Sequence, residues 1–235
     1  MRIIVLGDSI AQGLGVKGQA YADLLGNQII NLAQSAAQID YSYSLLPEIA
    51  ALQPDIVIIA HGITEAIVRP TPAALKLIPK RWRKIGWLDP RPYFSRRFHK
   101  RCYQQSESAL RWRVKVLLIR CFGGQTLGLP DDFECSLFTM TEALLRQTQA
   151  HVILLTHTGI DERFYPKSAA SLERYLLCAK SAASRASSPA RVSFCNVSGR
   201  LDRWSDYFAD HFHPNAVGHE KIAKAIRGII TGLPL

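Results

Sequence analysis

Five short runs of β-branched and other apolar residues recur along the chain, and segments with helical periodicity separate them. The runs are RIIVLG, QIINLA, DIVIIAHG, HVILLTHTG and RVSFCNV, at residues 2–7, 28–33, 55–62, 151–159 and 191–197. Strands this apolar are usually covered on both faces, which is typical of a parallel sheet. The alternation of strand and helix therefore predicts an α/β fold, a three-layer α/β/α sandwich.

Apolar residues three and four positions apart predict the helices of this sandwich. They lie at residues 20–27, 41–52, 135–150, 171–186 and 213–230. Pro214 falls early in the last of these, where its missing N–H costs nothing. The chain has 235 residues, 48% of them hydrophobic, and can bury a core without disulfides or a metal. We expect one domain over residues 1–235.

The cysteines bear on disulfides and metals, and the N-terminus bears on location. The five cysteines are scattered and contain no C-x-x-C pair, which argues against a disulfide framework and a zinc site, and we expect no metal or other cofactor. Met1 runs almost directly into the first strand, leaving no room for a secretory signal. No apolar run approaches the length of a membrane span. We therefore expect a cytoplasmic protein, with peripheral membrane contact as an alternative.

A basic insertion, expected at about residues 69–130, separates the third and fourth strands. Residues 69–120 hold 15 of the 29 lysines and arginines but only two acids, so their formal charge is +13 and the rest of the chain carries −3. Trp82, Trp87, Tyr93 and Phe94 are interleaved with the basic residues. The prolines at 70, 72, 90 and 92 predict that no long helix forms here.

Two interpretations of the insertion stay open. It is either a solvated charged loop or a lid that contacts an anionic partner. The aromatic side chains favour contact, because they can stack on sugar rings or sit at lipid headgroups. We expect an anionic substrate or a membrane surface as the partner of residues 69–120, and no specific nucleic acid.

Two motifs at opposite ends of the chain carry the chemistry. The first strand ends in Gly7, Asp8 and Ser9, and DHFHP places Asp210 three residues before His213. A carboxylate so placed can fix the tautomer of the imidazole, which can then activate a serine hydroxyl. The carboxyl ends of parallel strands share one edge of a sheet, so both motifs can meet there. A serine at a helix start is also surrounded by free N–H groups suited to an oxyanion.

These motifs resemble those of the SGNH (GDSL-like) hydrolases, a family of esterases and lipases. The first block is Gly7-Asp8-Ser9-Ile10 and the last is Asp210-His211-Phe212-His213-Pro214. The resemblance covers the chain in order and implies Ser9 as nucleophile, His213 as base and Asp210 as the acid that orients it. It also implies a flavodoxin-like sheet of five parallel strands in the order 2-1-3-4-5.

The two middle blocks depart from the family pattern. The N-x-G-x-S-G block stands here as Asn31-Leu32-Ala33-Gln34-Ser35-Ala36, which implies Ala33 N–H as an oxyanion donor beside Ser9 N–H. The G-x-N-D block stands as Gly62-Ile63-Thr64-Glu65, with Thr64 in place of a donating Asn. A threonine hydroxyl can donate, but it is shorter than an amide and rotates more freely. His61 and Arg69 are candidates to replace that Asn as a donor to the oxyanion.

The resemblance implies a serine esterase that cleaves an acyl ester through an acyl-enzyme on Ser9. We expect an acetyl ester on a carbohydrate or exopolysaccharide, contacted by Asp8, Gly62, Glu65 and Arg69. Two alternatives stay open: a carbohydrate O-acetyltransferase that uses the same dyad, and a polyanion- or membrane-binding module on a weakened esterase scaffold. Nothing in the sequence indicates an oligomeric state.

Overall fold

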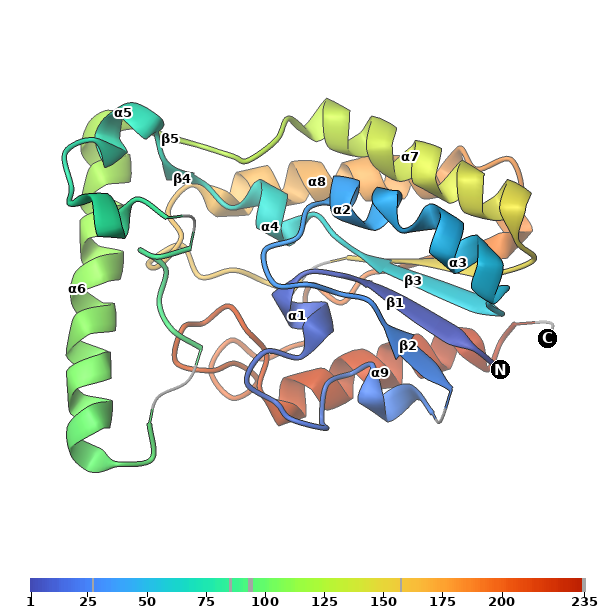
Figure 1. Ribbon diagram of the computed structural model, residues 1–235, viewed down its shortest axis with the longest axis horizontal. Coiled ribbons are helices and arrows are strands. Elements are labelled where there is room, and N and C mark those ends of the chain that lie inside the picture. The colour runs from blue at the N-terminus through green and yellow to red at the C-terminus, as the bar shows by residue number, and fades with distance from the viewer. Residues whose placement is uncertain (27, 85, 93–94, 157, 234–235) are drawn as a thin grey trace.

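The computed structural model describes residues 1–26, 28–84, 86–92, 95–156 and 158–233, and a five-stranded parallel sheet forms its centre (Figure 1). The strand order is β2-β1-β3-β6-β7, which confirms the predicted order once the separate pair β4-β5 is set aside. The five predicted runs all contain a strand. These are β1 (Ile3–Gly7), β2 (Ile29–Asn31), β3 (Ile56–Ala60), β6 (His151–Leu155) and β7 (Val192–Cys195).

Helices cover both faces of the sheet, as the sandwich prediction requires (Figure 1). One face carries α2 (Ile39–Ser44), α3 (Leu46–Leu52), α7 (Pro130–Gln147) and α8 (Ser168–Ser184), and the other carries α9 (Ala216–Ile230). The short helices α1 (Ser9–Gln12) and α4 (Ile63–Ala66) follow β1 and β3 directly. The strand β1, which lies between β2 and β3, is wholly buried and pairs with β3 from Ile3↔Ile56 to Gly7↔Ala60. The core lies between the sheet and these two helical layers.

Two predicted helices differ from the observed ones. The helix expected at residues 41–52 is divided into α2 and α3, because Pro47 in the first turn of α3 cannot donate a hydrogen bond to the preceding turn. The helix expected at 20–27 is only the 3₁₀ turn η1 (Asp23–Leu25), which ends at Gly26. Gly26 has a backbone conformation outside the helical region, and Asn27 lies outside the described residues.

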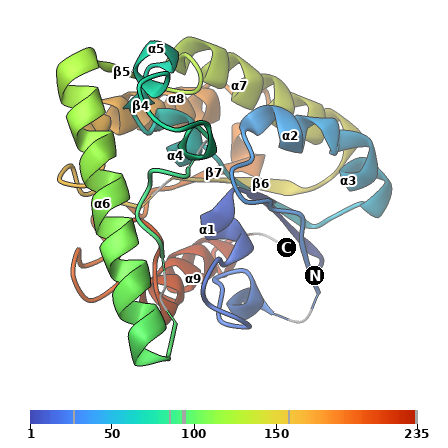
Figure 2. The ribbon, with the colours of Figure 1, turned by 60° about the vertical axis from the view of Figure 1, so that its left-hand side comes forward.

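The insertion folds into a small layer of its own at one end of the molecule. Its elements are β4 (Arg69–Pro70), α5 (Pro72–Leu75), the 3₁₀ helix η2 (Lys80–Trp82), α6 (Phe98–Phe122) and β5 (Gly124–Gln125). A separate apolar cluster of Ala74, Ile78, Leu88 and Leu118 ties α5 and the following loop to α6. Figures 1 and 2 show α6 standing across the end of the domain toward which the carboxyl ends of the strands point.

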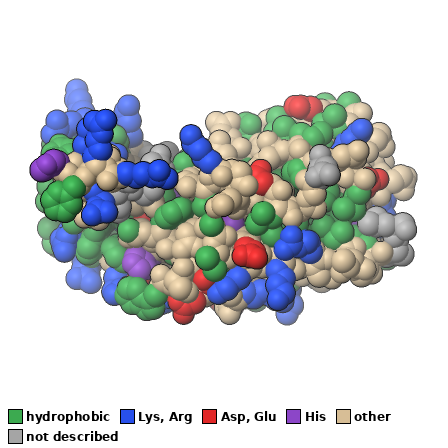
Figure 3. All heavy atoms as spheres, turned by 90° about the horizontal axis from the view of Figure 1, so that it is seen from below, with side chains coloured by type: hydrophobic (Ala, Val, Ile, Leu, Met, Phe, Trp, Pro, Cys, Tyr) green, Lys and Arg blue, Asp and Glu red, His purple; other side chains and the backbone are tan. Residues whose placement is uncertain are grey.

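The prediction that prolines prevent a long helix in the insertion is wrong for its second half. The helix α6 has 25 residues and begins after Pro92, the last proline before Pro130. Lys and Arg side chains crowd this end of the molecule, where apolar side chains also reach the surface (Figure 3). Of the four aromatic residues singled out in the sequence, Tyr93 and Phe94 lie outside the described residues. Among the described residues, no helix has both the length and the apolar composition to cross a bilayer.

Candidate active site

The turn after β1 fixes the position of the Ser9 side chain. Gly7 allows the strand to approach its neighbour closely, because a Cβ there would lie 2.6 Å from the carbonyl oxygen of Ala60. The Asp8 carboxylate caps α1 and accepts a hydrogen bond from Ile10 N–H at 2.9 Å. Ser9 is therefore the first residue of α1 and is held with only 8% of its surface exposed.

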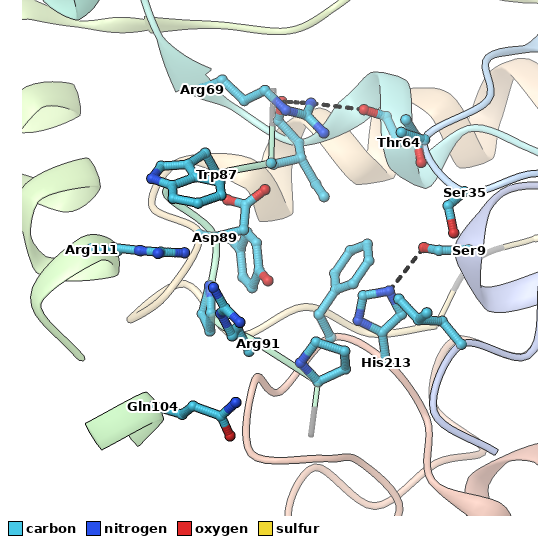
Figure 4. Close-up of a pocket in the computed structure, with 18 residues that line it drawn as sticks. Ser9, Ser35, Thr64, Arg69, Trp87, Asp89, Arg91, Gln104, Arg111 and His213 are labelled. Carbon is cyan, nitrogen blue, oxygen red and sulfur yellow. Dashed lines mark hydrogen bonds between the residues drawn. The ribbon is translucent and has the colours of Figure 1, made fainter. Parts of the chain in front are cut away.

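The turn before α9 brings His213 to the same edge of the sheet. The distance between His213 Nε2 and Ser9 Oγ is 2.8 Å (Figure 4). His213 Nδ1 lies 2.5 Å from Asp210 Oδ2, and Asp210 Oδ1 accepts the N–H groups of Phe212 and His213 at 3.1 Å each. Asp210 is fully buried, and these bonds hold its carboxylate against Nδ1 of the imidazole. The Ser9 hydroxyl, the His213 imidazole and the Asp210 carboxylate thus form one chain of hydrogen bonds, here called the triad. Ser9 and His213 are 204 positions apart in the sequence.

The buried acids next to the triad hold loops together. Thr64 Oγ1 donates to Asp8 Oδ2 at 2.7 Å, and burial raises the pKa of Asp8 above its usual value. Glu65 accepts Gly62 N–H at 3.0 Å and Ile39 N–H at 2.9 Å, and burial raises its pKa to about 7. Asp8, Gly62 and Glu65 therefore connect the ends of β1 and β3 to α2. This differs from the prediction that they contact substrate, since none of the three lines the pocket beside Ser9.

The predicted oxyanion donors Ala33 and Thr64 are engaged elsewhere. The Ala33 N–H donates to Asn31 Oδ1 at 3.0 Å, and Ala33 does not line the pocket. The Thr64 hydroxyl has one proton, and it is directed to Asp8. The prediction that Ala33 and Thr64 donate to the oxyanion is therefore corrected, because Asn31 and Asp8 accept these two hydrogen bonds.

The structure points to Ala36 as the donor that the sequence reasoning missed. Ala36 lines the pocket beside Ser9 and has φ +62°, a left-handed conformation that costs a non-glycine residue about 1–2 kcal/mol. Within the described parts of the chain, the N–H groups of Ser9 and Ala36 have no hydrogen-bond acceptor. The one signal in the sequence is that Ala36, like Ala33, stands at a glycine position of the N-x-G-x-S-G block.

His61 and Arg69, the two candidates to replace the donating Asn of the family, lie in different surroundings. His61 Nε2 lies 2.7 Å from the buried Ser42 Oγ, and burial lowers the pKa of His61 to about 3. It is a neutral residue of the interior outside the pocket. Arg69 does line the pocket, where it donates to the carbonyl oxygens of Thr64 at 2.8 Å and Ile67 at 3.1 Å.

A pocket of about 450 Å³ opens beside Ser9 and His213. Figure 4 shows the two residues on one side of it, and Arg69, Trp87, Asp89, Arg91 and Arg111 on the other. These five side chains come from the insertion, so the segment that interrupts the sheet supplies the far wall of the site. The sequence pointed to the insertion as a contact surface but gave no means to identify Arg91 and Arg111 as the residues that face the triad.

Comparisons with known proteins agree with this geometry. The sequence model of the GDSL-like Lipase/Acylhydrolase family matches residues 5–221. No curated protein sequence is significantly similar to the chain. Among solved structures, an acetylxylan esterase from Geobacillus stearothermophilus is similar with a TM-score of 0.60 and 15% identity, covering 97% of this chain and 93% of its own.

Two further solved structures share the fold over almost their entire length. A lipolytic protein of the G-D-S-L family from Veillonella parvula has a TM-score of 0.61 and 13% identity, covering 99% of this chain and 100% of its own. A lipase/acylhydrolase from Enterococcus faecalis has a TM-score of 0.57 and 16% identity, covering 99% and 96%. At these identities the structures establish a common fold, and the family match rests on the sequence itself.

Proposed function

Because the chain belongs to the GDSL-like lipase/acylhydrolase family and is a serine carboxylic ester hydrolase, we propose that it removes a short acyl group, most simply acetyl, from a carbohydrate. The observation that carries the chemistry is the hydrogen-bonded chain from Ser9 Oγ through His213 to Asp210. A serine placed 2.8 Å from an oriented imidazole has the base that it needs to attack an ester.

The reaction proceeds in two steps at this site. Ser9 Oγ attacks the ester carbonyl while His213 Nε2 takes its proton, and Asp210 holds Nδ1–H and stabilises the imidazolium. The N–H groups of Ser9 and Ala36 hold the oxyanion. His213 returns the proton to the leaving alcohol, which leaves acyl-Ser9. Water, deprotonated by His213, then releases the carboxylic acid and restores the Ser9 hydroxyl.

Two observations support a sugar acetate as substrate. Solved structures with this fold include acetylxylan esterases from Geobacillus stearothermophilus and a carbohydrate esterase family 2 enzyme from Corynascus thermopiles. The pocket holds an indole, Trp87, opposite the triad, and aromatic rings pack well against sugar faces. Its volume of about 450 Å³ suits a ligand the size of one or two sugar units.

The alternative acceptor is a sugar hydroxyl in place of water, which would make the protein an O-acetyltransferase. The basic insertion is the reason to test this reaction, because its positive charge would attract the phosphates of acetyl-coenzyme A. Acetate release from an acetylated sugar, measured against acetyl transfer from acetyl-coenzyme A, separates the two. We expect acetate release. The third hypothesis, a binding module without activity, is disfavoured by the hydrogen bonds that connect Ser9, His213 and Asp210.

The assignment is tested with p-nitrophenyl acetate. Ser9→Ala is expected to lower kcat by about 10³ or more, because losing the nucleophile of such a triad removes most of the catalysis. Ser106→Ala, at an exposed position on α6, is the matched control and should retain activity. Unchanged hydrolysis by Ser9→Ala would reject the proposed function.

A further inference from the structure

The wall of the pocket opposite the triad is rich in arginine. Arg69, Arg91 and Arg111 all line the pocket that contains Ser9 and His213 (Figure 4). Arg111 is 3% exposed and stacks on Trp87, with its guanidinium carbon 3.9 Å from a ring centroid. The insertion therefore fixes at least one of these cations in a buried position within the pocket.

The acidic residues nearby balance only part of this positive charge. Asp89 Oδ1 pairs with the buried Lys115 Nζ at 2.6 Å. Burial acts to raise the pKa of Asp89, but Lys115 and Arg69 outweigh it and lower that pKa. Glu107 pairs with Arg111 and lies 3.8 Å from Arg91. Four cations thus face two carboxylates, and among the described residues Arg69 has no acidic partner.

The same wall contains buried donors without acceptors. The Nε atoms of Arg69 and Arg111 and the indole Nε1 of Trp87 are each buried and lack a hydrogen-bond partner among the described residues. All three are donors, and each belongs to a side chain that lines the pocket. Buried N–H groups usually have partners, so an unpaired group of donors with excess positive charge indicates a site for an acceptor-rich anion.

We propose that Arg69, Arg91 and Arg111 bind an anionic group on the alcohol part of the substrate, so that the enzyme acts on an acyl ester of an acidic carbohydrate. The proposal rests on the proposed function and names its substrate class. A carboxylate or sulfate held by the guanidinium groups would place an ester on the same sugar toward Ser9, across the pocket. Guanidinium groups suit this role because their paired N–H donors can bind two oxygens of one carboxylate or of one tetrahedral oxyanion.

The inward position of these residues favours a soluble acidic sugar over a membrane. Arg69, Arg91 and Arg111 face the triad, whereas a lipid surface would contact the exposed side of α6. There Phe98, Tyr103, Leu110 and Leu117 are exposed beside basic residues such as Arg120. The pocket wall and the exposed side of α6 can therefore be tested separately by removing one charge from each.

The experiment compares the O-acetylated methyl glycosides of glucuronic acid and glucose, acetylated at the same positions. We expect the acidic ester to have a kcat/KM at least about 10-fold higher, as charge-assisted hydrogen bonds discriminate by roughly this factor. Arg91→Gln should reduce this preference about fivefold or more. The matched control Arg120→Gln removes one charge from the exposed side of α6 and should leave both rates unchanged. Galactose 6-sulfate acetylated in the same way tests sulfate against carboxylate.

Failure of this inference differs from failure of the proposed function. Equal hydrolysis of the acidic and neutral esters would overturn the anion site and leave the esterase intact. An equal loss of preference in Arg91→Gln and Arg120→Gln would also overturn it, because the effect would come from diffuse charge. Titration of Ser9→Ala with free glucuronate and glucose measures the site without turnover. Tighter binding of glucuronate, weakened by Arg91→Gln, supports the site; equal binding of both sugars contradicts it.

Discussion

The Thr64 hydroxyl illustrates how one residue's role depends on its partner. It donates to the buried Asp8 at 2.7 Å, so Thr64→Val would leave that carboxylate without one of its hydrogen bonds. We expect unfolding free energy to fall by about 1–3 kcal/mol. The kcat should fall less than about 10-fold, since an oxyanion donor would cost 10²–10³. Urea denaturation and ester hydrolysis measure both. A 100-fold loss of kcat with unchanged stability would instead make Thr64 an oxyanion donor.

A buried histidine, His219, makes the unfolding free energy depend on pH. His219 Nδ1 accepts the Tyr21 N–H at 3.2 Å, and burial, with a smaller effect of His213, lowers the pKa of His219 to about 4. Below pH 6.5 the unfolded chain binds a proton at this residue, and the folded chain does not until about pH 4. His219 therefore makes unfolding free energy fall as pH falls between these values, by about 1.4 kcal/mol per pH unit.

The variant His219→Asn isolates this contribution, since its amide oxygen can still accept the Tyr21 N–H. Stability curves at pH 6.5, 5.5 and 4.5 should be flatter for the variant than for the native chain, and the difference between them cancels other titrating groups such as Glu65. Parallel curves would show that His219 is not neutral in the folded state.

At the residue scale, the sequence predicted the meeting of Ser9, Asp210 and His213 better than it predicted the N–H donors around Ser9. Ser9, Asp210 and His213 lie in motifs whose members are close in sequence, and the shared sheet edge brings the two ends of the chain together. The choice between Ala33 and Ala36 is different. It depends on the Asn31 side chain capturing one N–H and on the φ of +62° at Ala36, neither of which the sequence states.

Among the elements, α6 contacts the rest of the molecule through a buried lysine as well as through the apolar cluster around Leu118. Lys115 extends from α6, pairs with Asp89 in the preceding loop at 2.6 Å, and lies 3.8 Å from the ring centroid of Tyr165 in the main domain. Removing one partner of a buried pair leaves the other charge uncompensated. Lys115→Met should therefore destabilise the protein by about 3–5 kcal/mol.

The double variant Lys115→Met with Asp89→Asn is the control for this pair. It should recover more than half of the lost unfolding free energy in urea denaturation, because no isolated charge remains. If Lys115→Met alone unfolds at the same urea concentration as the native protein, the pair does not hold the insertion in place.

The elements differ in how well the sequence predicted them, for a physical reason. The strands of the main sheet are buried on both faces, and this leaves continuous apolar runs in the sequence. The helix α6 packs against the small cluster around Leu118 and exposes much of its surface, so its sequence mixes charged and apolar residues without a clear pattern. The prolines singled out in the insertion all precede α6, so they interrupt only the segment before this helix.

Over the whole molecule, charge is unevenly distributed, with +13 on residues 69–120 and −3 on the remainder. If the positive wall attracts an acidic sugar ester, kcat/KM for that ester should fall several-fold as NaCl rises from about 0.05 to about 1 M, because the screening length shortens to about 3 Å. The neutral ester is the control and should change little. Equal salt dependence for both esters would contradict an electrostatic contribution to substrate binding.

The central claim is that Ser9 is the residue acylated during turnover, activated by a histidine from the other end of the chain. A fluorophosphonate forms a stable adduct with an activated serine, and mass spectrometry of the digested protein locates it. We predict one adduct per chain, on Ser9, with labelling strongly slowed by His213→Ala. An adduct on another serine, or ester hydrolysis that survives full labelling of Ser9, would contradict the account.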